Sequence, residues 1–211
     1  MAPPLANIVP TVQSLVPLCP EPVIESHIRR AATRFCEDTL AWVETLSAAQ
    51  VVAADFPYVV PAGAGRSVSR ILSVAIDGMA PPLDASSVDY EERHANNWLG
   101  ATGVPDRFVE APIGILHLVP LPNLSTSMAV TVALEPSSTG TEIGDDVYVK
   151  HWETIMSGAV VLLSIIPGVP WSSGEMAAVH GTLYDLGVAK AKVHAHLHRR
   201  LPQLSTSPAA L

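Results

Sequence analysis

Histidines in the last third of the chain have the spacing that comes closest to a chemical site. His194 and His198 are four positions apart, so on a helix they face the same side and can share a metal ion. His180 lies upstream, and His196 points to another face. Because no HExxH glutamate lies between them, packing or an interface explains these histidines better than a ligand set does. A zinc hydrolase that uses His180, His194 and His198 is the competing interpretation.

The other patterns that could support catalysis are incomplete. A serine hydrolase needs a GxSxG elbow, and neither residues 65–69 nor Ser157-Gly158 provides that spacing. The glycines of residues 63–65 lack the following Lys-Ser/Thr of a phosphate loop and predict a turn. The acidic pairs Glu91-Glu92 and Asp145-Asp146 diverge by about 100° on a helix, so they predict solvent-facing and capping roles. We therefore expect no enzymatic activity, no cofactor and no metal.

An amphipathic helix followed by a β-rich segment is predicted for the first two thirds of the chain. Apolar residues recur at spacings near 3.6 and predict a helix over about residues 21–47. Over about residues 48–136 this period gives way to short runs of β-forming residues separated by proline and glycine. Residues 71–78 predict a strand that ends in an Asp77-Gly78 turn. We expect a small antiparallel β subdomain there, and a short helix or loop around residues 90–93.

Two further long helices are predicted over about residues 146–166 and 173–200, separated by a proline-rich corner. Ser172 and Glu175 predict a capping box at the start of the second. Large apolar residues occupy part of that helix, and alanines and glycines keep the rest slim enough for close packing. The predicted fold is α+β: an antiparallel helical bundle of one N-terminal and two C-terminal long helices, with the β subdomain inserted.

The two ends of the chain lack such patterns. Five prolines within residues 1–20 disfavour helix at the positions before them and predict an extended N-terminal arm. The polar, proline-containing residues 201–211 predict a flexible C-terminal tail. Residues 21–200 have the length of a single domain.

Composition restricts the partners of the chain. Apolar residues make up 48% of it and charged residues 15%, and such a surplus often forms a subunit interface. The net charge of −8 argues against a protein that grips nucleic acid through its phosphates, yet DNA could slide past an acidic wall. Two cysteines form no disulfide framework and indicate synthesis in a reducing cytoplasm. A signal peptide and a membrane-spanning helix are not expected.

The order of several segments resembles a known family. The segments are residues 16–20, a helix with residues 31–37 and Trp42, then residues 71–78, 103–108, 116–122, 134–136 and 167–172. In this order, over about residues 15–201, the chain resembles the head-to-tail adaptor proteins of tailed bacteriophages, the neck or tail tubular protein A-like group. The chain departs from the family at residues 63–67 and 81–82, so contacts of those loops are not carried over.

The resemblance implies a structural protein of the virion neck, made in the host cytoplasm and lacking enzymatic activity. It implies a dodecameric ring of this chain between the portal protein and the next tail or nozzle protein, with a central channel for genomic DNA. We expect Arg199, Arg200, Leu201 and Leu204 to contact the portal, because a polar, proline-containing tail has little reason to fold alone. Another virion part, such as a stopper or tail terminator, is the alternative.

Overall fold

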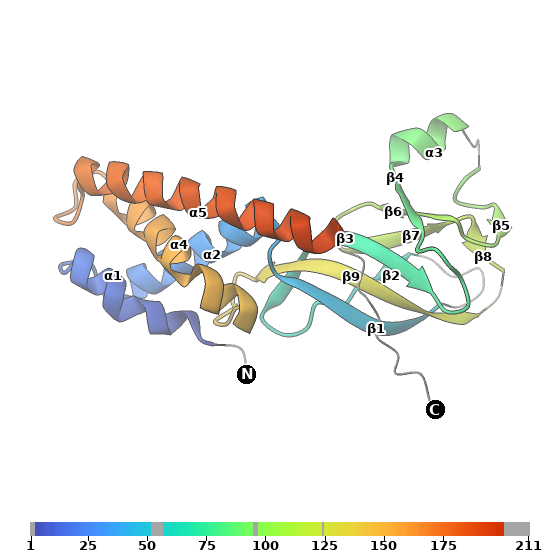
Figure 1. Cartoon of the computed structure of the whole chain (residues 1–211), viewed down its shortest axis with the longest axis horizontal. Coiled ribbons are helices and arrows are strands. Elements are labelled where there is room, and N and C mark those ends of the chain that lie inside the picture. The colour runs from blue at the N-terminus through green and yellow to red at the C-terminus, as the bar shows by residue number, and fades with distance from the viewer. Residues whose placement is uncertain (1–2, 52–56, 95–96, 124, 201–211) are drawn as a thin grey trace, which may run out of the picture.

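The computed structural model describes residues 3–51, 57–94, 97–123 and 125–200. Figure 1 shows an elongated molecule in which most helices gather in one half and the strands gather in the other. The predicted α+β class is confirmed. The order of elements along the chain is helices, then strands with one short helix among them, then two long helices.

The N-terminal segment is helical, so the prediction of an extended arm over residues 1–20 was wrong. A 3-10 helix η1 (Leu5–Ile8) leads into α1 (Val9–Leu15). Pro10 occupies the first turn of α1, where its missing N–H has no partner to lose. Only Pro3 and Pro4 precede these turns, and Pro4 forms a β-bridge with Glu142. The apolar side chains of these turns are buried in the core, which stabilises the segment against the rest of the fold.

Helix α2 (Glu21–Thr39) is shorter than the predicted range of residues 21–47. It ends at Leu40, which has φ 51° and ψ 38°, the left-handed conformation that commonly terminates helices. Trp42 is buried beyond the helix, and Val43 opens the first strand. Trp42 continues the apolar spacing of the helix, but it enters the core from the segment between α2 and β1. The spacing therefore predicted a helix that was too long.

One three-stranded antiparallel sheet adjoins the helices. Its order is β1-β9-β3, and its strands are β1 (Val43–Val51), β9 (Thr126–Pro136) and β3 (Arg66–Ile76). The predicted turn after β3 is present: Gly78 has φ 81°, and Met79 N donates to Ile76 O at 3.0 Å. Thr33 of α2 donates from Oγ1 to Pro136 O at 3.0 Å, so the helix and the central strand are hydrogen-bonded together.

A second sheet and a strand pair lie farther from the helices. The sheet has the order β2-β7-β6-β4, with β2 (Tyr58–Val59), β7 (Ile115–Val119), β6 (Arg107–Glu110) and β4 (Asp84–Ser86); the pair is β5 (Thr102–Gly103) with β8 (Leu121–Pro122). The β4–β6 and β5–β8 pairings are parallel, so the expectation of a purely antiparallel subdomain was wrong. Parallel pairing needs a long connection between the paired strands, and short-range turn signals do not reveal it.

The short helix α3 (Val88–His94) forms where a helix or loop was expected, and an ion pair between Glu91 and Arg107 attaches it to the second sheet. The carboxylate of Glu91 is fully buried, so the predicted solvent-facing or capping role was wrong for this residue. It accepts hydrogen bonds from Arg107 Nη1 at 2.8 Å and from Ser86 Oγ at 2.6 Å. A buried carboxylate is costly unless it is paired and hydrogen-bonded, so these contacts fix the position of α3 on β4 and β6.

The two C-terminal helices are α4 (Asp145–Ser164) and α5 (Gly174–Arg200), within two residues of the predicted bounds. The cap of α5 is displaced by one residue from the predicted box. Ser173 Oγ accepts a hydrogen bond from Met176 N at 3.3 Å. Ser172 Oγ instead donates to Ser164 O at 3.1 Å, which ties the corner back to the end of α4.

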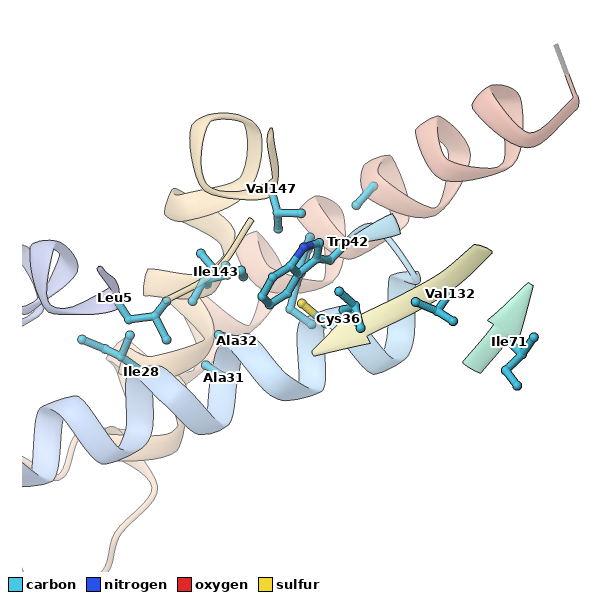
Figure 2. Packing of buried hydrophobic residues seen from close by; sticks show 14 of the residues in the cluster. Leu5, Ile28, Ala31, Ala32, Cys36, Trp42, Ile71, Val132, Ile143 and Val147 are labelled. Atoms are coloured by element: carbon cyan, nitrogen blue, oxygen red, sulfur yellow. The ribbon is translucent and has the colours of Figure 1, made fainter. Parts of the chain in front are cut away.

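The main hydrophobic core joins the N-terminal turns, α2, α4 and the first sheet. Figure 2 shows Leu5 beside Ile28 of α2, and Trp42 among Cys36 and Val147. The core extends from there along the central strand to Val132. Because one cluster covers both halves, the helices are packed onto the first sheet directly.

Close packing between α4 and α5 depends on glycine. A Cβ atom at Gly158 would lie 2.7 Å from the Tyr184 ring and 3.3 Å from Ala31. We predict that Gly158→Ala lowers the free energy of unfolding, because this overlap costs about 1–3 kcal/mol and exceeds the gain in helix propensity of up to about 1 kcal/mol.

The matched control is Gly181→Ala on the α4-facing side of α5. Its Cβ would meet only Val161, at 4.0 Å, so the substitution should be neutral or stabilising. Urea unfolding followed by circular dichroism measures both variants. Equal stability of the two variants would show that the helices are not held at this separation.

Candidate assembly surface

Several large apolar side chains of α5 are exposed. Val179, Leu183, Leu186 and Val193 are 54%, 50%, 64% and 57% exposed, and we call them the α5 stripe. Their spacing of four, three and seven residues places them along one side of the helix, the pattern of a helix that packs against another helix. Soluble proteins rarely leave a row of large apolar side chains of this length exposed to water. The α5 stripe is therefore a candidate contact surface.

A different side of α5 faces the protein and packs closely against α4. His180, Tyr184 and Ala191 are buried. Gly187 abuts Thr154 of α4 so closely that a side chain there would overlap it. His180 Nδ1 lies 3.4 Å from Ser157 Oγ of α4. These contacts set the rotation of α5 about its axis, and that rotation turns the α5 stripe outward.

Helix α4 carries a second incompletely covered apolar surface. Val149 is 74% exposed, and Tyr148, Trp152 and Met156 beside it are half-buried. We call these four residues the α4 ridge. Sequence reasoning does not reveal that this side of α4 is open to solvent, because apolar residues occur almost all round the helix and resemble core positions.

A third apolar surface lies in the β half. Val59 of β2 and Ile113 are 71% and 69% exposed. Val60 N donates to Gly114 O at 3.0 Å, which holds the segments that carry them side by side. Val59 belongs to the second sheet, and Ile113 lies in the turn between β6 and β7, where the neighbouring Gly114 approaches Val68 of β3. It gives the β half a contact surface of its own.

Two of the four residues predicted to bind the portal belong to α5. Arg199 and Arg200 are its last two residues. Their side chains, and Leu201 and Leu204, lie outside the described residues. Their role therefore stays a prediction.

The structure separates two of the three histidines of the alternative zinc-hydrolase interpretation. His180 and His194 are fourteen positions apart on one helix, which separates them by about 21 Å along its axis. His180 is buried against Ser157, whereas His194 is exposed. The His198 side chain lies outside the described residues. Among the residues whose side chains are described, no group of three His, Cys, Asp or Glu converges as metal ligands would.

Sequence reasoning missed His151 of α4. This side chain is buried, and its ring lies 5.1 Å from the Phe35 ring of α2. Burial lowers the pKa of His151, and His194, Lys150 and Lys190 lower it further by repelling a positive charge. Burial also lowers the pKa of His180. Both histidines are therefore favoured in their neutral forms between the helices.

The remaining sequence patterns have structural roles. The glycines at residues 63–65 form a turn with positive φ at Gly63 and Gly65, and the turn leads into β3 as predicted. Asp145 and Asp146 lie in the first turn of α4, where negative charge is favourable. Arg29 of α2 donates from Nε to Gly140 O at 2.7 Å. Arg29 therefore holds the loop that precedes α4.

Acid should loosen the helical half through these histidines. The pKa of His151 is lower in the folded state than its ordinary value near 6.5 in the unfolded state. The unfolded chain therefore binds more protons, so stability is complete above about pH 6.5 and is lost as pH falls below it. We predict that His151→Leu reduces this loss, as measured by urea unfolding at about pH 7.5 and about pH 5.5.

The His151→Leu variant should still lose some stability at acid pH, because burial also lowers the pKa of His180. The control is His94→Gln, at an exposed position on α3. When the pH is lowered from about 7.5 to about 5.5, this variant should lose as much stability as the wild type. A loss of equal size in wild type and His151→Leu would contradict the assignment to His151.

Comparison with known proteins adds no relative. No protein-family model matches the chain, and no curated protein sequence matches it significantly. Within residues 3–51, 57–94, 97–123 and 125–200, no helix is both long and apolar enough to cross a membrane. The exposed apolar surfaces of α5, α4 and the second sheet are therefore the main guide to function.

Proposed function

We propose that the chain is a structural protein of a tailed-bacteriophage virion, a head-to-tail adaptor that forms a ring between the portal and the next tail component. The observation that supports this most is the α5 stripe, because a helix with large apolar side chains on its outer side gains by packing against another subunit. The ring body is an antiparallel bundle of α2, α4 and α5. Genomic DNA passes through the ring without sequence-specific contacts.

The separate apolar pair in the β half supports a protein with two different neighbours. Val59 lies on β2 of the second sheet and Ile113 in the turn between β6 and β7. The C-terminal end of α5 lies at the junction where the helices meet the first sheet, beside β3 (Figure 1). An adaptor needs one surface for the portal and another for the tail. We assign the C-terminal end of α5 to the portal and the β half to the tail component.

The net charge of −8 suits a channel through which DNA moves. A wall with clustered Lys and Arg would bind phosphates and slow the DNA, as nucleic-acid-binding proteins do. An acidic ring repels the backbone and keeps the DNA away from its wall. This property is shared by other neck components, so a stopper or tail terminator is the alternative assignment.

Attachment to the portal tests the proposal. We predict that the purified chain co-sediments with portal rings from the same phage, and that deleting residues 201–211 weakens this binding by at least about tenfold, roughly 1.4 kcal/mol. Contacts between the tail and the portal would provide that contribution, net of the entropy lost when the tail becomes ordered.

The charge of the last two helical residues is tested separately. Arg199→Glu with Arg200→Glu should weaken binding, and the matched Arg199→Lys with Arg200→Lys should retain most of it, because the attraction depends chiefly on charge. Circular dichroism checks that each variant keeps its helices. A wild-type chain that does not bind the portal would refute the adaptor assignment, and unchanged binding of the truncated chain would refute only the role of the tail.

A further inference from the structure

We infer that the α5 stripe of one copy docks on the α4 ridge of the next copy, so that the two surfaces form the subunit contact of the ring. The inference rests on the proposed function for the existence of a ring. The occupant of the α5 stripe is thus a second copy of this chain.

The two surfaces of one chain cannot cover each other. Successive residues of a helix are rotated by about 100°. On α4, the residues that contact α5 are Thr154, Ser157 and Gly158, and the α4 ridge lies roughly opposite to them. On α5, the α5 stripe is rotated by roughly 130° from the side that faces α4. The two surfaces therefore point away from each other, on opposite sides of the α4–α5 pair.

Two different surfaces on opposite sides produce a ring more readily than a dimer. A contact between unlike surfaces leaves one of each kind free at the ends of any chain of subunits. Addition of copies stops only when the rotation between neighbours closes the assembly. Pairing of two α5 stripes would instead give a closed dimer and would leave the α4 ridge uncovered.

The heights of the two surfaces along the bundle match. Within one chain, Thr154 abuts Gly187, and His194 is close enough to His151 to lower its pKa. If neighbouring copies are rotated about an axis along the bundle, equal levels face each other. Met156 is then level with Leu186 of the neighbour. The C-terminal half of the α5 stripe therefore meets the α4 ridge along its length.

Charge also matches at this level. Lys190 is exposed on the side of α5 that carries the stripe, between Leu186 and Val193. Glu153 is exposed on α4 next to Trp152 of the ridge. Because Thr154 and Gly187 are at one height, Lys190 of one copy and Glu153 of the next lie at about the same height. Opposite charges at the border of an apolar contact favour this pairing over pairing of two α5 stripes, which would bring lysines together.

Variants that remove one surface at a time test the inference. The first variant carries Leu183→Glu and Leu186→Glu in the α5 stripe, and the second carries Val149→Glu in the α4 ridge. All three side chains are at least half exposed, so folding should be retained. Mass photometry of the wild type should show species larger than a dimer, and each variant alone should need at least about tenfold more protein to associate.

Mixing the two variants separates contacts between unlike surfaces from contacts between like ones. Each variant keeps the surface that the other has lost, so a one-to-one mixture should form dimers of one copy of each and no larger species. If Val149→Glu assembles as well as the wild type, α5 stripes pair with each other and the inference is wrong. The control is Ala178→Glu, at an exposed position of α5 that is three or four residues from no member of the stripe, and this variant should assemble normally.

A charge exchange tests the alignment. Lys190→Glu should weaken assembly by placing two acidic groups together, and addition of Glu153→Lys should restore it toward the wild-type level. No restoration would refute the pairing of these two residues and hence the alignment of the surfaces.

Portal binding measured on the same variants distinguishes this inference from the proposed function. A wild-type chain that remains monomeric at all concentrations, or an α5-stripe variant that assembles like the wild type, overturns the subunit contact. The proposed function would survive either result if the chain still bound the portal. Failure of portal binding by a chain that assembles through these surfaces would overturn the adaptor assignment instead.

Discussion

The close approach of α4 and α5 determines what the rest of the helical surface can do. Gly158 and Gly187 let the two backbones come near enough for Tyr184 and Thr154 to fill the space between them. Only side chains that fit this narrow space can occupy the facing sides of the two helices, so the larger apolar side chains lie elsewhere around each helix. The leucines and valines of the α5 stripe are outside because the glycines and the tyrosine are inside. Close packing within one chain thus creates the surface that is left for another.

Local sequence signals located the long helices well because their causes are local. Prolines and glycine end α4, and a serine begins α5, so both predicted ranges were correct to within two residues. The same reasoning failed at the N-terminus, where Pro10 fits the first turn of a helix that tertiary contacts stabilise. It failed again at Leu40, whose left-handed conformation ends α2 without a glycine to announce it.

The candidate surface was only partly accessible to sequence reasoning. The apolar surplus predicted a subunit interface, and the residues of the α5 stripe are visible as a periodic set. Periodicity alone does not tell which side of a helix with two apolar sides faces the core. That choice depends on complementary shapes on α4, such as Gly158 opposite Tyr184, which are far apart in the sequence. The α4 ridge was missed for the same reason, because Trp152 and Met156 look like core residues.

The junction between the halves bears on how a ring of this chain would transmit load. Trp42 lies against Gly144 just before α4, and the Arg66 guanidinium sits 5.1 Å from the Trp42 ring. Arg66 Nη1 also pairs with Glu44 at 2.9 Å, which joins β3 to β1. These contacts link the entry to α4, the first sheet and the end of α2 in one packed unit. In the proposed adaptor, such a junction would resist bending between the helical ring body and the β half, so displacement imposed at the tail would reach the contacts between copies.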